Sequence, residues 1–256
     1  MMSRSVAIVT GAGRGIGRAI AEALAARNFD LAVTDLMPEA EGEALLQDLA
    51  RCGCRARYHS GDIADIATHA AFVERALAEF GHIDCLVNNA GMEAVVRGDL
   101  LDLAPENFDR IMAVNLRGTV FLTQAVVSAM LSQPPTDVPR SVVTITSVSA
   151  ELASSERIDY CMSKAALAMW VRGLALRLAP EGVGVFDVRP GIVRSAMTAK
   201  VAAAYDERIA AGMVPARRWG ETCDVAAVVA NLACGDFAFA TGSVIAVDGG
   251  LSIPRL

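Results

Sequence analysis

The sequence has few aromatic residues, few histidines and no excess of positive charge, and each shortage excludes a class of protein. Aromatic residues make up 5% of the 256 residues, and 23 Lys and Arg stand against 29 Asp and Glu, for a formal net charge of −6. Because nucleic-acid-binding proteins carry basic patches that neutralise phosphates, this balance predicts no nucleic-acid partner. The three histidines, His59, His69 and His82, lack the spacing of zinc ligands, so we expect no metal site.

Paired cysteine motifs and long uninterrupted apolar runs are also missing. The six cysteines are scattered without a CxxC pair, and we expect them to be reduced, small hydrophobic side chains. A mean hydropathy of +0.40 would suit a membrane protein. However, a charge, Gly, Asn or Pro interrupts each apolar stretch before the ~18 residues that a spanning helix needs. No signal-peptide cleavage site follows Met1, and we therefore expect a cytoplasmic protein without a membrane segment.

Short apolar runs of strand length alternate with longer segments of helical period, which is typical of a parallel sheet covered by helices. Most of the runs are continuous rather than alternating, which indicates strands buried on both faces. No repeat or linker suggests a second domain. We predict one doubly wound α/β domain over residues 1–256, with a mainly parallel seven-stranded sheet and helices on both faces. The predicted strands are 6–10, 31–35, 55–59, 85–88, 141–146, 184–189 and 244–247, and the predicted helices are 16–27, 40–51, 66–80, 105–131, 157–179, 199–213 and 223–233.

A glycine-rich segment, Thr10-Gly11-Ala12-Gly13-Arg14-Gly15-Ile16-Gly17, joins the first predicted strand to the first predicted helix. Glycines permit a tight turn there and let backbone N–H groups approach a pyrophosphate at the positive end of the helix. A glycine-rich turn can also be only a turn, but strand, glycines and helix come in the order that dinucleotide binding requires. We expect Gly11, Arg14, Gly15, Ile16 and Gly17 to contact a dinucleotide.

Asp35 stands at the end of the second predicted strand, where dinucleotide-binding folds place the group that binds the adenosine ribose. A carboxylate there accepts hydrogen bonds from both ribose hydroxyls and repels a 2′-phosphate, so it favours NAD over NADP. Two alternatives stay open. Asp35 can simply cap the turn between strand and helix, and the Arg14 guanidinium could pair with the 2′-phosphate of NADP.

Two further strand ends carry candidate cofactor contacts. Asp62 and Ile63 follow the third predicted strand and could seat the adenine, although Asp62 can equally be a helix N-cap. Asn88-Asn89-Ala90-Gly91 follows the fourth strand. We expect Asn89, Ala90 and Gly91 both to brace the sheet and to bring backbone close to a ribose.

Ser147, Tyr160 and Lys164 form the candidate catalytic group. Tyr160 and Lys164 are four residues apart within a predicted helix, so their side chains share one face. A phenol with a pKa near ~10 is a poor acid or base at neutral pH, but a nearby ammonium lowers that pKa. This tuning suits general acid–base catalysis on an alcohol or a carbonyl.

Six motifs in this order resemble those of the short-chain dehydrogenase/reductase family over essentially the whole chain. They are the glycine-rich segment, Asn88-Asn89-Ala90-Gly91, Val114-Asn115-Leu116, Ser147 with Tyr160-Cys161-Met162-Ser163-Lys164, Pro190-Gly191-Ile192-Val193-Arg194-Ser195, and Thr241-Gly242 with Asp248-Gly249-Gly250. The resemblance implies a Rossmann domain, a nicotinamide cofactor and a small ketone or alcohol as substrate. It also places Pro190, Gly191, Val193 and Ser195 beside the nicotinamide, with Ser195 where a threonine is usual.

The resemblance further implies catalytic roles for Asn115, Ser147, Tyr160 and Lys164. Tyr160 would protonate the nascent alkoxide, and Ser147 would hydrogen-bond the substrate oxygen. Lys164 would hold the nicotinamide ribose and lower the pKa of Tyr160, and Asn115 would anchor a water that relays protons to Lys164. Residues 195–219 would form a mobile lid. The apolar helices 105–131 and 157–179 and the tail 244–256 would join four copies into a homotetramer.

The substrate stays open. The motifs are most similar to those of 3-oxoacyl-[acyl-carrier-protein] reductases, which makes an NADPH-dependent reductase of that kind the first alternative. Asp35 and the lack of an evident basic patch for an acidic carrier both weigh against it. A non-catalytic dinucleotide-binding protein has no use for Tyr160, and a sugar-nucleotide epimerase usually needs a longer chain. Glu151 and Arg157, beside the expected active-site mouth, are either substrate contacts or solvated charges.

Overall fold

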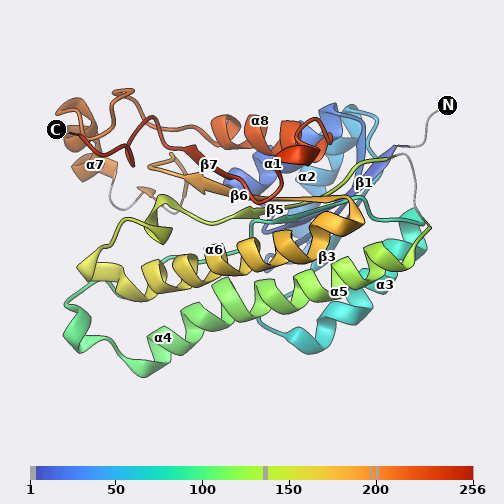
Figure 1. The fold of residues 1–256 in the computed structure, drawn as a ribbon, viewed down its shortest axis with the longest axis horizontal. Helices are drawn as coiled ribbons and strands as arrows, with labels where there is room; N and C mark the ends of the chain where they lie inside the picture. Colours follow the sequence, from blue (N-terminus) through green and yellow to red (C-terminus); the bar gives the residue numbers. More distant parts are fainter. Residues whose placement is uncertain (1–3, 135–137, 197, 200–201, 256) are drawn as a thin grey trace.

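The computed structural model describes residues 4–134, 138–196, 198–199 and 202–255 (Figure 1). Seven parallel strands form one sheet in the order β3-β2-β1-β4-β5-β6-β7, which confirms the doubly wound α/β prediction. The order reverses between β1 and β4, and in such sheets ligands bind beyond the carboxyl ends of the strands at that point. The strands are β1 (Ser5–Thr10), β2 (Phe29–Asp35), β3 (Ala56–Ser60), β4 (Cys85–Asn88), β5 (Arg140–Ile145), β6 (Val183–Pro190) and β7 (Val244–Val247).

Helices cover both faces of the sheet (Figure 1). One layer holds α1 (Gly15–Ala26), α2 (Glu39–Arg51) and α8 (Thr222–Ala233), and the other holds α3 (His69–Phe80), α5 (Thr119–Ser132) and α6 (Ile158–Leu178). Two shorter helices complete the fold: α4 (Pro105–Met112), which continues through a π-helical segment into α5, and α7 (Ala202–Ala210), which precedes α8.

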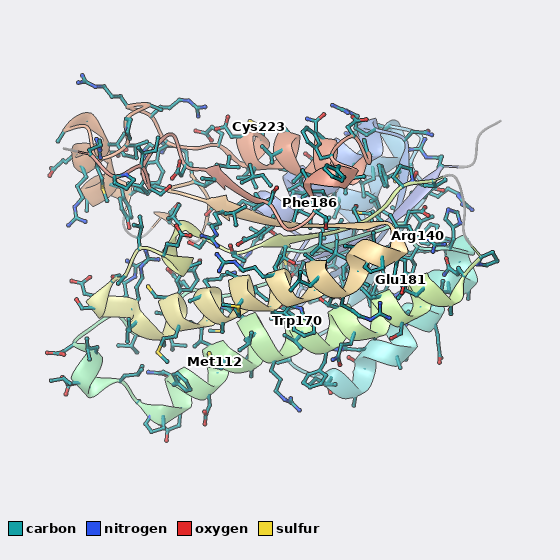
Figure 2. All side chains as sticks on the ribbon, viewed as in Figure 1. Met112, Arg140, Trp170, Glu181, Phe186 and Cys223 are labelled. Atoms are coloured by element: carbon teal, nitrogen blue, oxygen red, sulfur yellow. The ribbon has the colours of Figure 1, made fainter. Side chains whose placement is uncertain are left out.

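The continuous apolar runs produce two cores, one on each face. In β1, Ala7 and Val9 pack into the layer of α1, α2 and α8, whereas Val6 and Ile8 pack into the layer of α3, α5 and α6, and all four are fully buried. Phe186 of β6 packs into the first of these cores (Figure 2). Side chains alternate across a strand, so a strand buried on both faces is apolar at most positions.

The predicted helix 105–131 is continuous but not uniform. It runs from Pro105 to Ser132 through a π-helical segment, Ala113–Gly118, that separates α4 from α5. Its 28 residues have a mean hydropathy of 1.3 in the most apolar window, enough to cross a membrane by length and composition alone, contrary to the expectation that interruptions exclude this. Half of that window is buried in the fold, because α5 packs on the sheet.

Two predicted segments reach beyond the described residues. The predicted lid 195–219 and helix 199–213 include residues 197, 200 and 201, which lie outside the described parts. In the described remainder of the lid, Ile209, Val214 and Trp219 form a small buried cluster.

Candidate active site

The glycine-rich segment forms a close turn at the start of α1. Gly11 and Gly15 have φ angles of +65° and +59°, which side-chain-bearing residues rarely adopt. A Cβ on Gly17 would lie 2.0 Å from Gly11 O, whereas a Cβ on Gly15 would meet nothing within 4 Å. Among the described residues no side chain caps α1, and its first turn contains no acid. The first N–H groups of α1 are therefore free to bind an anion, and the space beside Gly15 admits one.

Thr10 and Asn89 bind the glycine turn to the end of β4. Thr10 Oγ1 accepts hydrogen bonds from the backbone N–H groups of Asn89 (3.0 Å) and Ala90 (2.9 Å). The Asn89 side chain donates to Thr10 O and Gly11 O, both at 3.0 Å. The predicted bracing role of Asn89 is therefore visible. The sequence analysis missed Thr10, whose only signal is a hydroxyl at the last position of the strand before the glycines.

Asp35 lies at the carboxyl end of β2 against the glycine turn. Its Oδ2 accepts a hydrogen bond from Gly13 N (2.8 Å) and its Oδ1 accepts one from Met37 N (3.2 Å). The carboxylate therefore does stabilise the local turn. Each carboxylate oxygen keeps a second lone pair, so the group can still accept from ribose hydroxyls. Arg14, the N-cap residue of α1, is exposed beside the same turn.

Asp62 and Ile63 occupy the loop after β3. Asp62 Oδ1 accepts from Ala64 N (2.8 Å), and its Oδ2 lies 3.7 Å from Arg110 Nη2. Asp62 therefore stabilises a local turn, but it is not the helix N-cap that the alternative predicted, because Asp65 caps the helical turn Ile66–Thr68 that follows. A Cβ on Gly118 would lie 2.4 Å from Ile63 O, so this loop packs directly on the end of the π-helical segment.

Asn115 is fully buried within that π-helical segment. Its Oδ1 accepts from Met92 N (2.8 Å), and its Nδ2 donates to Met92 O (3.0 Å) and Ser163 Oγ (3.1 Å). Both amide donors are thus used, and a water beside Asn115 would have to donate to its remaining oxygen lone pair or to its backbone carbonyl. A Cβ on Gly91 would lie 3.2 Å from Asn115 Oδ1 and 3.5 Å from Lys164 Nζ, so the missing side chain leaves room for both.

Ser147, Tyr160 and Lys164 meet where β5 ends and α6 begins. Ser147 follows β5, and its Oγ accepts from Ser149 N (3.0 Å) and hydrogen-bonds Tyr160. Lys164 is buried, and its Nζ donates to Ile145 O (3.1 Å) and lies 5.8 Å from the centroid of the Tyr160 ring. The structure therefore brings together the three residues that the spacing singled out.

Burial is the largest influence on the ionisation of this group. Burial raises the pKa of Tyr160, and the Ser147 hydrogen bond and the charge of Arg157 only partly oppose it. Burial lowers the pKa of Lys164 to about 8, against the attraction of Asp187. The pKa of Tyr160 is therefore raised overall, because desolvation of the phenol is the largest effect, and the lowering by Lys164 stays a prediction.

The two charges at the mouth have different surroundings. The Glu151 side chain is 62% exposed and forms an ion pair with buried Arg189. Arg157 is half-buried, and its Cζ lies 5.2 Å from the centroid of the Tyr160 ring. Neither is merely a solvated charge. The sequence does not predict a role for Arg189 or its partner Asp187, because both lie within the run 184–189, whose pattern predicts a buried strand.

The segment after β6 lies at the same edge of the sheet. Gly191 N donates to Val247 O (3.0 Å), and a Cβ on Gly191 would lie 2.7 Å from Asp248 Cβ. Pro190 ends β6 within the core, and Val193 is buried. Ser195 N donates to Thr198 Oγ1 (3.0 Å). The predicted nicotinamide segment is thus fixed against β7.

Comparison with known proteins gives consistent matches along the whole chain. The sequence model described as Enoyl-(Acyl carrier protein) reductase matches residues 11–252. The 3-oxoacyl-[acyl-carrier-protein] reductase FabG of Escherichia coli is 34% identical over 248 residues, covering 96% of each chain. The crystal structure of a 3-oxoacyl-[acyl-carrier protein] reductase from Brucella melitensis in complex with NAD is 59% identical, covers 100% of both chains and has a TM-score of 0.97.

A structure with bound NADP is also similar. This Agrobacterium tumefaciens protein is 28% identical, with a TM-score of 0.86 and coverage of 98% of this chain and 97% of its own. Fold, motifs and relatives agree over nearly all of the sequence. The chain belongs to the short-chain dehydrogenase/reductase family and is an oxidoreductase of the kind that acts on CH–OH groups.

Proposed function

We propose that this chain interconverts a secondary alcohol and a ketone, with Tyr160 as general acid and base and NAD(H) as the preferred cofactor. The observation that carries the proposal is the meeting of Ser147, Tyr160 and Lys164 at the sheet edge that also holds the glycine turn. A binding module needs the turn but not an acid beside it.

The side chains suit the steps of a carbonyl reduction. When bound, the nicotinamide supplies the hydride, or accepts it in the reverse direction. Tyr160 gives its hydroxyl proton to the carbonyl oxygen as the alkoxide forms. Ser147 Oγ accepts from Ser149 N and hydrogen-bonds Tyr160; with a substrate bound, its hydroxyl would donate to the same carbonyl oxygen and stabilise the developing charge. In the oxidative direction Tyr160 takes the proton back.

Lys164 and Asn115 support this proton transfer. The ammonium has three donors, one of which binds Ile145 O, so two remain for the ribose hydroxyls next to the nicotinamide. Asn115 holds Met92 and Ser163 in place around Lys164 and offers its remaining acceptors to a water that would connect Lys164 with solvent.

The cofactor residues divide by position along the dinucleotide. The free N–H groups of α1 and the open space at Gly15 fit the pyrophosphate. The residues around it would be Gly11, Arg14, Gly15, Ile16 and Gly17, with Asp35 at the adenosine ribose and Asp62 and Ile63 at the adenine. The nicotinamide half would lie against Asn89, Ala90, Gly91, Tyr160, Lys164, Pro190, Gly191, Val193 and Ser195.

The preference for NAD rests on Asp35. Its carboxylate is held against the glycine turn by Gly13 and Met37, so it cannot easily move away from a 2′-phosphate. We expect higher kcat/KM with NAD(H) than with NADP(H), and a smaller ratio in Asp35→Ala. Steady-state rates with both nucleotides test this, and a strong NADP(H) preference in the wild type would refute it.

The catalytic assignment is tested by Tyr160→Phe in a screen of ketones and alcohols followed by nicotinamide absorbance. We expect turnover to fall at least about 100-fold, because a general acid contributes that much or more, while NAD affinity is kept. Tyr58→Phe is the matched control, since its hydroxyl donates to a backbone carbonyl, Met37 O, away from Ser147 and Lys164. Unchanged turnover in Tyr160→Phe would contradict the mechanism.

A 3-oxoacyl thioester is the second candidate substrate, favoured by the names of the FabG and Brucella relatives. Higher kcat/KM for a 3-oxoacyl thioester than for simple ketones in the same screen would select it. Equal or lower values would leave the broader alcohol and ketone activity. Both candidate substrates would receive their proton from Tyr160.

The proposal also includes a cytoplasmic location and a lid that residues 195–219 would form over the substrate.

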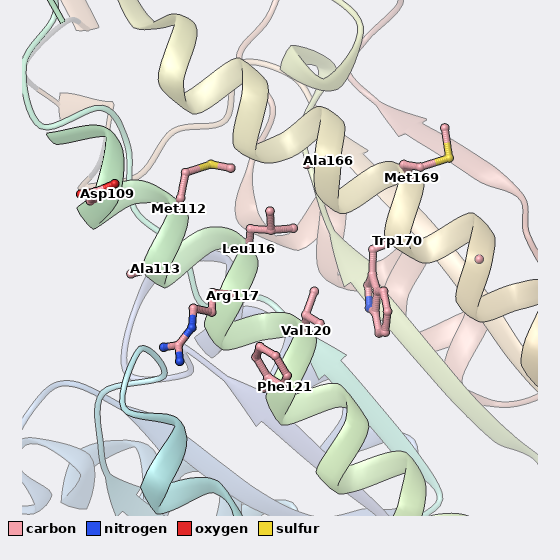
Figure 3. A pocket seen from close by; sticks show the side chains of 11 residues that line it. Asp109, Met112, Ala113, Leu116, Arg117, Val120, Phe121, Ala166, Met169 and Trp170 are labelled. Atoms are coloured by element: carbon pink, nitrogen blue, oxygen red, sulfur yellow. The ribbon is translucent and has the colours of Figure 1, made fainter. Parts of the chain in front are cut away.

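Assembly as a homotetramer is supported by a groove of about 730 Å³ that α4, the π-helical segment and the start of α5 form with α6 (Figure 3). Apolar side chains line it, and Asp109 and Arg117 add one charge of each sign, which two copies related by a two-fold axis could pair. Its lining includes Met112, Leu116, Val120, Phe121, Met169 and Trp170.

Gel filtration tests this assembly. Met169 is 62% exposed, so Met169→Asp should leave the protomer folded and shift the protein to a smaller species. Leu101, 85% exposed and outside the groove, provides the control variant Leu101→Asp. A wild-type protein that elutes as a monomer would refute the proposal.

A further inference from the structure

Strand β6 contains a buried ion pair beside the proposed catalytic group. Asp187 and Arg189 are 1% and 4% exposed. Arg189 Nε and Nη2 both lie 2.8 Å from Asp187 Oδ2, so the two charges neutralise each other inside the protein. Buried pairs of this kind give little net stability compared with apolar residues. The contacts of the pair, rather than its contribution to stability, therefore indicate its role.

The pair contacts both ends of the segment that carries Ser147. At one end, Thr146 Oγ1 donates to Asp187 Oδ1, and Thr146 N donates to Val188 O at 2.9 Å. At the other end, Arg189 Nη1 donates to Glu151 Oε1. Ser147 lies between these two attachments, directly after Thr146.

Asp187 also acts on Lys164 through its charge. Its charge raises the pKa of Lys164 against the effect of burial. The same carboxylate therefore holds the start of the Ser147 segment and favours the cationic form of the lysine.

We propose that Asp187, Arg189 and Glu151 form a positioning network that fixes the Ser147 segment between Thr146 and Glu151. The network rests on the proposed function, because it acts only through Ser147 and Lys164. Its residues touch no reacting atom. Arg189 must be an arginine for this role, since its fork reaches Asp187 and Glu151 at once.

Other charged and titratable groups surround the site and set the background for a pH measurement. Lys164 Nζ lies 5.8 Å from the centroid of the Tyr160 ring. Tyr160 in turn feels Arg157 and Cys161 from the start of α6 and Glu93 from the loop after β4. Asp187 differs from these groups because its charge acts on Lys164. Its substitution therefore changes the pKa of Lys164 specifically.

The first experiment cuts the exposed end of the network. Glu151→Ala removes one attachment of Arg189 and leaves the buried pair, so the protein should fold. We expect kcat to fall about tenfold through misplacement of Ser147, with KM for NAD(H) changed less than about twofold. Glu151→Gln, which can still accept from Arg189, should restore most of the rate. Glu181→Ala, which cuts the exposed Arg177–Glu181 pair (2.9 Å) near the other end of α6, is the control and should match the wild type.

The second experiment measures NAD affinity against pH and needs no substrate. In the wild type, affinity should fall as pH rises through about 8, where Lys164 loses its charge. Asp187→Asn removes a negative charge that favours the ammonium of Lys164. The pH midpoint of NAD binding should therefore move about 0.5–1 pH unit lower. Glu151→Ala should not move it.

The outcomes separate the network from the proposed function. A wild-type midpoint near 8 that stays in place in Asp187→Asn, together with unchanged kcat in Glu151→Ala, overturns the network alone. Turnover that survives in Tyr160→Phe overturns the proposed function. A shifted binding midpoint in Asp187→Asn supports the effect of Asp187 on Lys164 whatever the substrate is.

Discussion

Gly17→Ala tests how closely the glycine turn packs on the end of β4. A Cβ at this position would lie 2.0 Å from Gly11 O and 2.4 Å from Asn89 Nδ2. Contacts below 3.0 Å essentially never occur for a Cβ, so α1 and the Thr10–Gly11 backbone must separate by about 1 Å. The obstacle is a backbone carbonyl of the turn itself, which has no rotamer to change.

The expected cost follows from this contact. Overpacking typically costs 1–3 kcal/mol, and a clash with backbone belongs at the upper end, about 3 kcal/mol. For a chain of this size each kcal/mol shifts Tm by roughly 2–4 °C, so Gly17→Ala should melt about 6–12 °C lower. NAD affinity should fall as well, because the displaced turn carries the N–H groups proposed for the pyrophosphate.

Thermal unfolding followed by circular dichroism, with all proteins at one concentration, measures the effect. Gly98→Ala is the matched control, since a Cβ there meets nothing within 4 Å and its φ is not in the left-handed region. Its Tm should stay within about 2 °C of the wild type. A Gly17→Ala protein with unchanged Tm and NAD affinity would show that the turn is not packed as described.

Two further predictions concern charge and buried amides. In the reductive direction, kcat/KM should fall above pH 8, because the Lys164 cation is lost as pH rises through its pKa of about 8, while Tyr160, with its pKa raised by burial, stays protonated. Lys164→Arg, which stays charged, should remove that limb from the pH profile, and a limb that persists would assign it to another group. Asn88→Ala should lower the free energy of unfolding by about 2 kcal/mol, because the Asn88 amide donates to Thr123 Oγ1 (2.9 Å) and Thr144 Oγ1 (3.3 Å) in the core. Urea denaturation measures this loss, and an unchanged midpoint would contradict it.

Local patterns in the sequence determined most of the fold. All seven predicted strands and their helical partners are present, with strand ends displaced by at most two residues, as in β2, which begins at Phe29 rather than at residue 31. The reason is that most of these strands are buried on both faces and therefore mainly apolar, and this shows in a short window. The glycine turn and the Tyr160–Lys164 pair were predictable for the same reason, since turn geometry and i, i+4 spacing are local properties.

Tertiary structure decided what depends on residues far apart in the chain. The π-helical segment that buries Asn115 against Met92 and Ser163 has no local signal in an apolar helix. The link from Arg189 to Glu151 exists only because β6 lies beside β5. The pKa of Tyr160 rises rather than falls because burial, which packing alone sets, outweighs nearby positive charge. The sequence therefore determined which groups the site contains, and the packing of the folded chain determined their charges and their supports.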